Sequence, residues 1–204
     1  MLINLILALS LIGYFSISWL VPWEELTTNS TISISYLFDI FIVLLAAFSF
    51  RKIPNLKLNL LRHLAQFIFA IFLAGIFAYL PVHLQWQTPF KYLDKLFIQL
   101  IILAPLIEEF VFRFSLYELQ EKSKLPTVIK YLINAIAFSI SHAPALWILP
   151  EVFHQFIIYQ LGYTFVLGLY CYHIKFRYKS DSAVIIIHLL FNLVFYGFVK
   201  LSLL

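Results

Sequence analysis

Apolar residues fill seven long stretches of the chain, separated by short segments that gather charged residues and prolines. The stretches cover residues 2–21, 32–50, 64–80, 96–119, 127–146, 152–172 and 182–203. Most have about 20 residues, enough for an α-helix to cross a hydrocarbon core about 30 Å thick. The sequence lacks the alternation of a β-barrel, and lipid cannot satisfy free backbone groups. The pattern therefore predicts an all-α, polytopic transmembrane bundle of about seven spans.

Composition agrees with a membrane protein. The 204 residues are 63% hydrophobic and only 12% charged, whereas an ordinary soluble domain is about 25% charged. We expect residues 1–204 to form one domain whose surroundings are membrane lipid. The net charge of +4 is expected to reflect cytoplasmic loops rather than a nucleic-acid partner. Cys171 is the only cysteine, which excludes an intrachain disulfide and a cysteine-based metal site.

Basic residues concentrate in alternate loops. These loops carry, in order, Arg51, Lys52, Lys57 and Arg62, then Lys122, Lys124 and Lys130, then Lys175, Arg177 and Lys179. Cytoplasmic loops are the ones enriched in Lys and Arg. The pattern predicts a cytoplasmic N-terminus and a C-terminus on the opposite side.

Two adjacent glutamates interrupt the stretch 96–119, in the sequence LAPLIEEFVFRF. A charge at the bilayer centre costs about 3 kcal/mol, so such residues indicate a functional site. Glu109 and Arg113 are four residues apart and can pair, while Glu108 is rotated by about 100°. The unpaired carboxylate suits a general base. An ion-pair network that only fixes packing is the alternative, although it would need one glutamate rather than two. Pro105 favours a kink just before the pair.

The stretch 127–146 contains a histidine in the sequence FSISHAP. Phe138 lies one helical turn before His142 and could form a wall of a site. Because Pro144 follows, we expect the helix to bend or end there. A hydrogen-bonded packing role is the alternative for this histidine.

The stretch 182–203 contains a second polar pair in the sequence HLLFN. His188 and Asn192 are four residues apart and share one helix face. At 1.5 Å per residue, the polar residues of the three stretches lie at similar depths, on the cytoplasmic side of the midplane. Two donors on one face can bind a developing oxyanion, and interhelical hydrogen bonding is the alternative.

Together these side chains supply the groups needed for peptide cleavage by water. A carboxylate and an imidazole can activate the water, and a second histidine and an asparagine can stabilise the intermediate. Carboxylates and imidazoles could alternatively hold a zinc ion. We favour metal-free chemistry without a cofactor, because Arg113 competes with a cation for the glutamates. The sequence contains no HExxH motif and no GxSxG elbow.

Three motifs in order carry a family resemblance. EEFVFR matches EExxxR, FSISH matches FxxxH, and HLLFN matches HxxxN. Residues 105–192 thus resemble the CAAX-protease and bacteriocin-processing (CPBP, or Abi) family of intramembrane proteases. The resemblance implies an all-helical, glutamate-dependent peptidase with a cavity open to the cytosol. It implies that Glu108 and His142 activate water and that His188 and Asn192 form an oxyanion hole. The second glutamate and the arginine would support the site.

The resemblance also sets expectations for substrate and location. We expect an endopeptidase with its motif-bearing core at about 96–203, in a bacterial plasma membrane. Its substrate would be a peptide or membrane protein that can carry a lipid. The eukaryotic branch cleaves prenylated tails, and the shorter length of this chain argues against that substrate. A non-catalytic immunity or assembly factor on the same fold is the alternative. A proton-relaying transporter is disfavoured because no inverted repeat is found.

Overall fold

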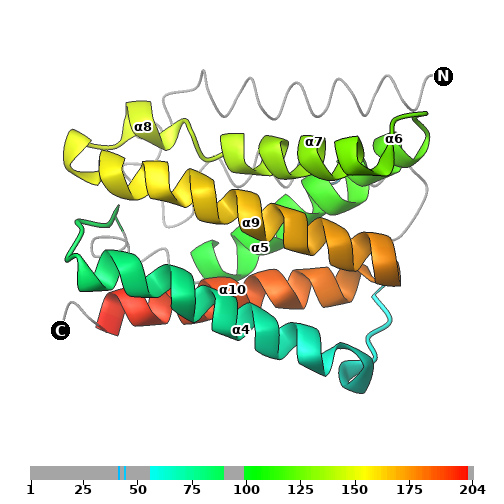
Figure 1. The fold of residues 1–204 in the computed structure, drawn as a ribbon, viewed down its shortest axis with the longest axis horizontal. Coiled ribbons are helices and arrows are strands. Elements are labelled where there is room, and N and C mark those ends of the chain that lie inside the picture. Colours follow the sequence, from blue (N-terminus) through cyan, green and yellow to red (C-terminus); the bar gives the residue numbers. More distant parts are fainter. Residues whose placement is uncertain (1–40, 42–43, 45–55, 90–98, 202–204) are drawn as a thin grey trace.

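A computed structural model of the chain describes residues 41, 44, 56–89 and 99–201, and every regular element in these ranges is helical. The elements are α4 (Leu60–His83), η3 (Gln99–Leu103), α5 (Ala104–Glu109), η4 (Phe110–Leu116), α6 (Tyr117–Glu121), α7 (Thr127–Ile140), α8 (Ala145–Ile148), η5 (Glu151–Phe153), α9 (His154–Tyr178) and α10 (Asp181–Leu201). Figure 1 shows the long helices running side by side along one direction. The all-α prediction is confirmed for these residues.

Four helices are long and apolar enough to cross a membrane. They are Leu60–His83, Thr127–Ile148, Glu151–Tyr178 and Asp181–Leu201. They match the predicted stretches 64–80, 127–146, 152–172 and 182–203.

The remaining three predicted spans are not confirmed. The stretches 2–21 and 32–50 lie outside the described residues, apart from residues 41 and 44. The stretch 96–119 begins outside them, and its described part is divided into alternating π- and α-helical segments. A count of about seven spans therefore stays a prediction, with four supported by the described residues.

Polar side chains and turns fix the ends of the helices. The side chain of Asn59 caps α4 by accepting a hydrogen bond from the Arg62 backbone N–H at 3.0 Å. The helix α9 ends at Tyr178, and the next residue, Lys179, caps it with a left-handed backbone conformation (φ of 50°). Its N–H donates to the Lys175 carbonyl at 2.9 Å. The chain then turns directly into α10.

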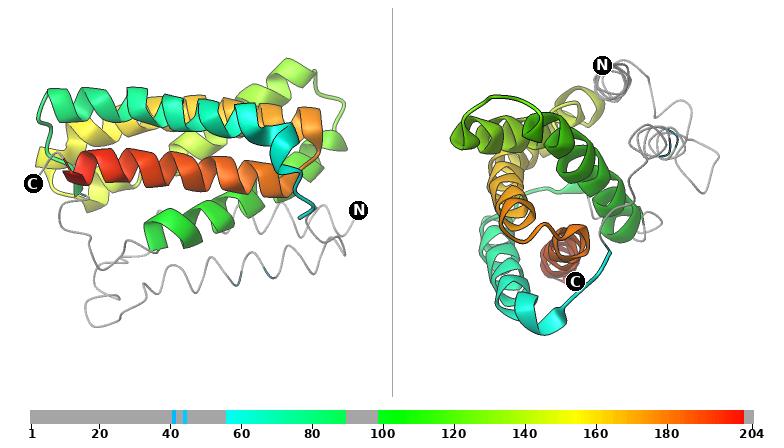
Figure 2. Two further views of the ribbon diagram at one scale, coloured as in Figure 1. Left: turned by 90° about the horizontal axis from the view of Figure 1, so that it is seen from below. Right: turned by 90° about the vertical axis from the view of Figure 1, so that its right-hand side faces the viewer.

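The helix α10 lies at the centre of the described part. Figure 2 shows it surrounded by α4, α9 and the segment that contains α5 and η4. On α4, three fully buried alanines follow one another every four residues, Ala70, Ala74 and Ala78. Small side chains in such a row let two helix backbones approach closely. The row thus accounts for the extensive packing of α4 against α10.

A similar close approach joins α7 to α9. A Cβ atom added at Gly168 of α9 would lie 3.0 Å from the Ala135 Cα and 3.2 Å from the Phe138 ring. A Cβ this close to the α7 backbone would need the backbone to move, so glycine is favoured here for packing rather than for an unusual backbone conformation. This contact sets α9 directly against the end of α7 that carries Phe138.

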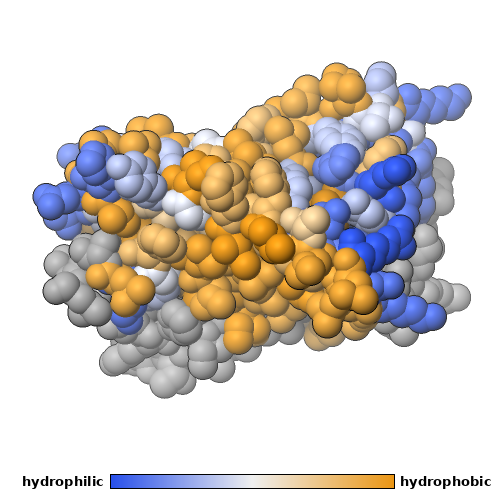
Figure 3. Space-filling view, turned by 60° about the horizontal axis from the view of Figure 1, so that its bottom comes forward, coloured by the Kyte–Doolittle hydropathy of each residue, from blue (hydrophilic) through white to orange (hydrophobic). Residues whose placement is uncertain are grey.

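The outer surface of the bundle is apolar, the reverse of a soluble protein. On α4, Leu64, Ile68, Phe72 and Ile76 are each at least half exposed. Figure 3 shows, on the face in view, a hydrophobic band across the middle with hydrophilic residues toward the two ends. Such a band matches the hydrocarbon core of a bilayer. The protein is an integral membrane protein.

Candidate active site

Glu108 and Glu109 lie on α5, a six-residue α-helical segment between two π-helical segments, η3 and η4. Pro105 in its first turn has no N–H to donate to the carbonyl one turn earlier. In η4, the Asn134 side chain of α7 donates to the Phe112 carbonyl at 2.8 Å. Insertion of a side chain into the hydrogen-bond ladder is a known cause of local helix distortion. The disturbance predicted at Pro105 thus takes the form of π turns on both sides of the glutamates.

Glu109 joins α5 to α10 and to η4. Its Oε1 lies 2.7 Å from His188 Nδ1, and its Oε2 lies 3.3 Å from Arg113 Nε. The predicted pairing of Glu109 with Arg113 is therefore present. All three side chains are at most 3% exposed. Arg113 also donates through Nη2 to the Gly168 carbonyl at 3.4 Å. Glu109 is thus engaged on both oxygens and is sealed from water.

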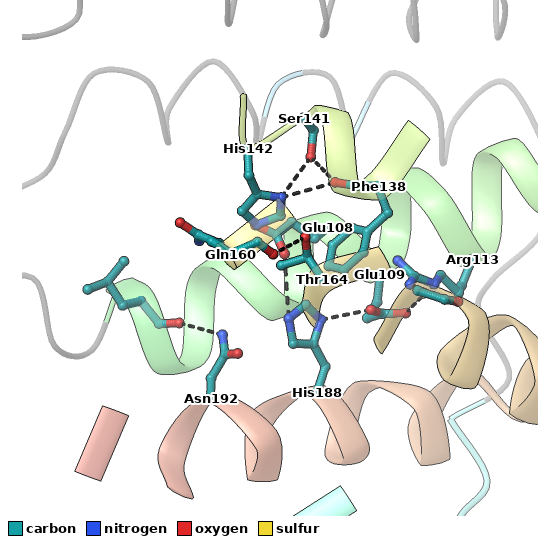
Figure 4. A network of polar contacts seen from close by, with 12 residues as sticks. Glu108, Glu109, Arg113, Phe138, Ser141, His142, Gln160, Thr164, His188 and Asn192 are labelled. Atoms are coloured by element: carbon teal, nitrogen blue, oxygen red, sulfur yellow. Dashed lines mark hydrogen bonds and ion pairs between the residues drawn. The ribbon is translucent and has the colours of Figure 1, made fainter. Parts of the chain in front are cut away.

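Glu108 points to the other side of α5, toward two imidazoles. Its Oε1 lies 3.9 Å from His142 Nε2, and its Oε2 lies 3.5 Å from His188 Nε2. Its side chain is 18% exposed, against 2% for Glu109. Figure 4 shows the two carboxylates on opposite sides of the His188 ring. Glu108 is the carboxylate that water can reach.

His142 lies in a turn rather than inside a helix. The helix α7 ends at Ile140, and residues 141–144 form the turn that leads into α8. The sequence predicted that the helix would bend or end at Pro144, and the span is interrupted by this turn, which begins three residues before the proline. Before the turn, the Phe138 carbonyl accepts from Ser141 Oγ at 2.7 Å and lies 3.0 Å from His142 Nδ1. A carbonyl oxygen only accepts, so the proton of His142 is on Nδ1 and Nε2 faces Glu108.

The Phe138 ring forms a wall of the site, as the motif spacing predicted, and lies against two imidazoles and the Arg113 guanidinium. Its ring meets the imidazoles of His142 and His188 edge to face, with centroid distances of 5.2 Å and 5.5 Å. The Arg113 guanidinium carbon lies 4.3 Å from the ring centroid, within range of a cation–π contact. The fully buried ring therefore holds both imidazoles in fixed orientations.

Asn192 lies one turn after His188 on α10, on the same face, as predicted. Its Nδ2 donates to the Leu100 carbonyl of η3 at 3.1 Å. That bond uses one of the two amide hydrogens and fixes the direction of the side chain. The second hydrogen is left to bind another acceptor, and Asn192 lines the same cavity as Glu108.

A cavity of about 160 Å³ collects these groups. Its lining includes Glu108, His142, His188 and Asn192, together with side chains of η3 and α9. A larger cavity of about 310 Å³ lies against Glu109 and Arg113 and has an almost wholly apolar lining. The smaller cavity is the candidate active site, because the polar groups that reach solvent converge there.

Sequence reasoning missed several lining residues of this cavity. They are Gln160, Tyr163 and Thr164 of α9 and Tyr196 of α10. None belongs to one of the three motifs, and polar residues of these types are common in membrane helices as packing residues. The packing of α9 against α7 brings the first three to the site, and Tyr196 lies one turn after Asn192 on α10.

The acidic and imidazole side chains of the site are also the types of residue that bind metal ions. Within the described residues, no group of three or more His, Cys, Asp or Glu side chains is arranged to hold a metal ion. Glu109 is engaged with Arg113 and His188 on both oxygens, which leaves Glu108 and the two Nε2 atoms. These three groups are the acidic and imidazole donors that face the cavity.

Comparison with known proteins identifies the family. Residues 94–194, about half of the chain, match a family model described as type II CAAX prenyl endopeptidase Rce1-like. Neither a curated protein nor a solved structure matches the chain. The matched stretch contains the three motifs and every residue of the network in Figure 4. The chain therefore belongs to the Rce1-like CAAX-protease family, a family of intramembrane proteases.

Proposed function

We propose that this protein is an intramembrane endopeptidase in which Glu108 and His142 activate the attacking water. The observation that carries the proposal is the 3.9 Å separation of Glu108 Oε1 and His142 Nε2. This distance is too long for a direct hydrogen bond. Both atoms line the cavity and both can accept a hydrogen bond. A water molecule beside them can donate one O–H to each.

The tautomer of His142 supports this role. Because Nδ1–H donates to the Phe138 carbonyl, the lone pair of Nε2 faces the carboxylate. Two acceptors that face each other repel unless a donor lies between them. A water held in this way directs its oxygen lone pairs away from both groups, toward a bound carbonyl carbon.

We assign His188 and Asn192 to the oxyanion. His188 can donate from Nε2 only as an imidazolium, because its Nδ1–H already binds Glu109. The carboxylates of Glu108 and Glu109 and the Arg113 guanidinium leave one negative charge, which the imidazolium neutralises. Removing an uncompensated charge from a low-dielectric site is favourable. The free amide hydrogen of Asn192 supplies the second donor.

The cycle then follows from these positions. The water oxygen bonds to the scissile carbonyl carbon while its proton passes to Glu108. The negative charge that forms on the carbonyl oxygen is held by His188 and Asn192. On collapse, the C–N bond breaks, and Glu108 returns the proton to the leaving amine. The products are a carboxylic acid and an amine, which leave as carboxylate and ammonium once the acid has passed its proton to the amine. Glu109 with Arg113 keeps His188 in place throughout.

We further propose that the cavity opens toward the cytosol. Six basic residues lie just before or within the start of α7 and at the end of α9: Lys122, Lys124, Lys130, Lys175, Arg177 and Lys179. Figure 1 shows these two helix ends at the same end of the bundle. Lys130 and Lys179 both pair with Glu121 there. A cluster of positive charges supports a cytoplasmic location for this end of the bundle. We propose that the N-terminus is also cytoplasmic.

The substrate we propose is a peptide or membrane-protein segment, with or without a lipid on it. The family description refers to prenyl endopeptidases, which supports a lipid-bearing tail as one class. Metal-free chemistry is part of the proposal, and zinc is its alternative. The ion pair between Arg113 and Glu109 supports the metal-free form, because the guanidinium competes with a cation for that carboxylate.

One assay tests catalysis, substrate class and metal together. Purified protein in lipid vesicles is incubated with matched farnesylated and unmodified peptides, with and without a chelator, and products are identified by mass spectrometry. We expect cleavage that survives the chelator and is lost in Glu108→Gln and His142→Ala. Glu151→Gln, an exposed glutamate of η5, is the matched control and should cleave normally.

The outcomes separate the possibilities. Cleavage that persists in correctly folded Glu108→Gln would reject the proposed mechanism. Loss of cleavage on chelation, restored by zinc, would favour the metal-dependent form. Intact binding of a partner with no cleavage of any peptide would favour a non-catalytic role on the same fold.

A further inference from the structure

Gln160 lies on α9 and belongs to none of the three motifs. Its side chain is half-buried and lines the cavity that contains Glu108, His142 and Asn192. Its backbone carbonyl accepts a hydrogen bond from Thr164 at 2.7 Å. Among the residues that the structure describes, no group forms a hydrogen bond with the carboxamide of its side chain. Figure 4 shows this side chain beside His142 and Glu108.

Two neighbouring polar side chains of the cavity already donate to backbone carbonyls. Thr164 donates its hydroxyl to the carbonyls of Gln160 and Leu161. Asn192 donates to the Leu100 carbonyl. The carboxamide of Gln160 therefore differs from these two neighbours, since its two donors and its acceptor are all available to a ligand.

A peptide bound for cleavage brings further backbone groups into the cavity. The scissile carbonyl faces Glu108 and Asn192, but the peptide groups on either side also lose their water. Each unpaired N–H or C=O that is buried in this way is costly. Leu100, Ile101 and Leu167 line the cavity with apolar surface and offer no side-chain partner.

We propose that Gln160 binds a peptide group of the substrate next to the scissile bond. This inference rests on the proposed function and adds a substrate-recognition residue to it. A carboxamide can accept from the N–H and donate to the carbonyl of one residue of an extended peptide, because these two groups point to the same side, and this pairing fixes the register of the peptide relative to Glu108. Such a pair selects an extended peptide backbone regardless of its side chains. It gives the enzyme a means to recognise a peptide whose lipid or sequence varies.

Backbone ester substitution tests this directly. Peptides in which each amide flanking the scissile bond is replaced in turn by an ester lose one N–H at a known position. For the wild-type protein, we expect kcat/KM to fall about 10-fold for the ester at one position, because one hydrogen bond is lost. Gln160→Leu should cleave the all-amide peptide about 10-fold more slowly and show no further loss with that ester.

Controls keep the two proposals separable. Gln155→Leu changes an exposed glutamine of the same helix and should behave as wild type. Gln160→Asn is a second variant if Gln160→Leu folds poorly, and it should lose the same position-specific ester effect. If Gln160→Leu and Gln160→Asn retain the full ester effect, or cleave the all-amide peptide normally, the role of Gln160 is rejected. If Glu108→Gln still cleaves, the proposed function itself fails.

Discussion

His188 and Glu109 connect α10 to α5 through a 2.7 Å contact between Nδ1 and Oε1, 79 residues apart in the chain. Arg113 engages the other oxygen of the same carboxylate. Glu108, the adjacent residue, is instead directed into the cavity and is partly open to water. Neighbouring glutamates thus have different surroundings, and their substitution should have different consequences.

Glu109→Gln should destabilise the protein, because Arg113 would be left as a buried charge without its partner. Breaking a buried pair in this way costs about 3–5 kcal/mol. Glu108→Gln should change the free energy of unfolding by less than about 1 kcal/mol, since this side chain reaches water. Thermal unfolding of both variants in one detergent measures the difference. Equal losses in the two variants would contradict the assigned positions.

The double variant Glu109→Gln/Arg113→Met should recover part of that stability. Removal of both charges leaves no uncompensated ion, and a methionine fills much of the same apolar space. Thermal unfolding would then give a midpoint between those of the wild type and Glu109→Gln. No recovery would mean that the Glu109 contact with His188, rather than the ion pair, sets the stability.

Asn192→Ala should reduce kcat by about 10²–10³-fold, the usual cost of a lost oxyanion donor. The KM should change little, because the donor acts mainly on charge that develops in the transition state. Loss of the single bond to Leu100 should cost only about 1 kcal/mol of stability. Steady-state cleavage by this variant, with its unfolding measured in parallel, tests the assignment. A rise in KM at unchanged kcat would contradict it.

Phe138→Leu should lower kcat by about 10-fold or more, because the ring orients both imidazoles and the Arg113 guanidinium. The volume change alone should cost about 1 kcal/mol of stability. Phe72→Leu, a lipid-exposed change on α4, is the matched control and should be silent in the cleavage assay. Equal activity in the two variants would show that Phe138 only fills space.

Gly168→Ala should destabilise the protein by about 1–3 kcal/mol, because the new methyl group would meet the α7 backbone at Ala135. Gly162→Ala on the same helix has no atom within 4 Å of the added Cβ. There, the higher helix propensity of alanine should leave stability unchanged or raise it by up to about 1 kcal/mol. Thermal unfolding of the two variants side by side measures this contrast.

The spacing of charged residues predicted much of the site. Residues four apart on a helix share a face, so the contact of Glu109 with Arg113 and the shared face of His188 and Asn192 followed from sequence alone. The hydropathy pattern likewise predicted α4, α7, α9 and α10, because about 20 apolar residues in a row have few other stable structures in lipid.

Other features depend on contacts that no local pattern encodes. The π turns around α5 involve Asn134, which is far from them in sequence and donates into η4. The helix α7 ends before His142 because the backbone groups of residues 141–143 form turn hydrogen bonds. The interruption therefore begins a few residues before Pro144, where the sequence predicted it. Gln160 gave no signal, since a lone glutamine in an apolar helix reads as an ordinary packing residue.

The π-helical segments also bear on how relatives of this chain should be compared. A π turn holds about one residue more than an α turn of the same height. Loss of one residue within Phe110–Leu116 would convert a π turn into an α turn, so the helix would stay continuous and the residues beyond it would keep nearly the same face. Alignments of this family should therefore permit single-residue gaps inside this helix as readily as in the loops, because such a gap leaves the orientation of the flanking site residues unchanged.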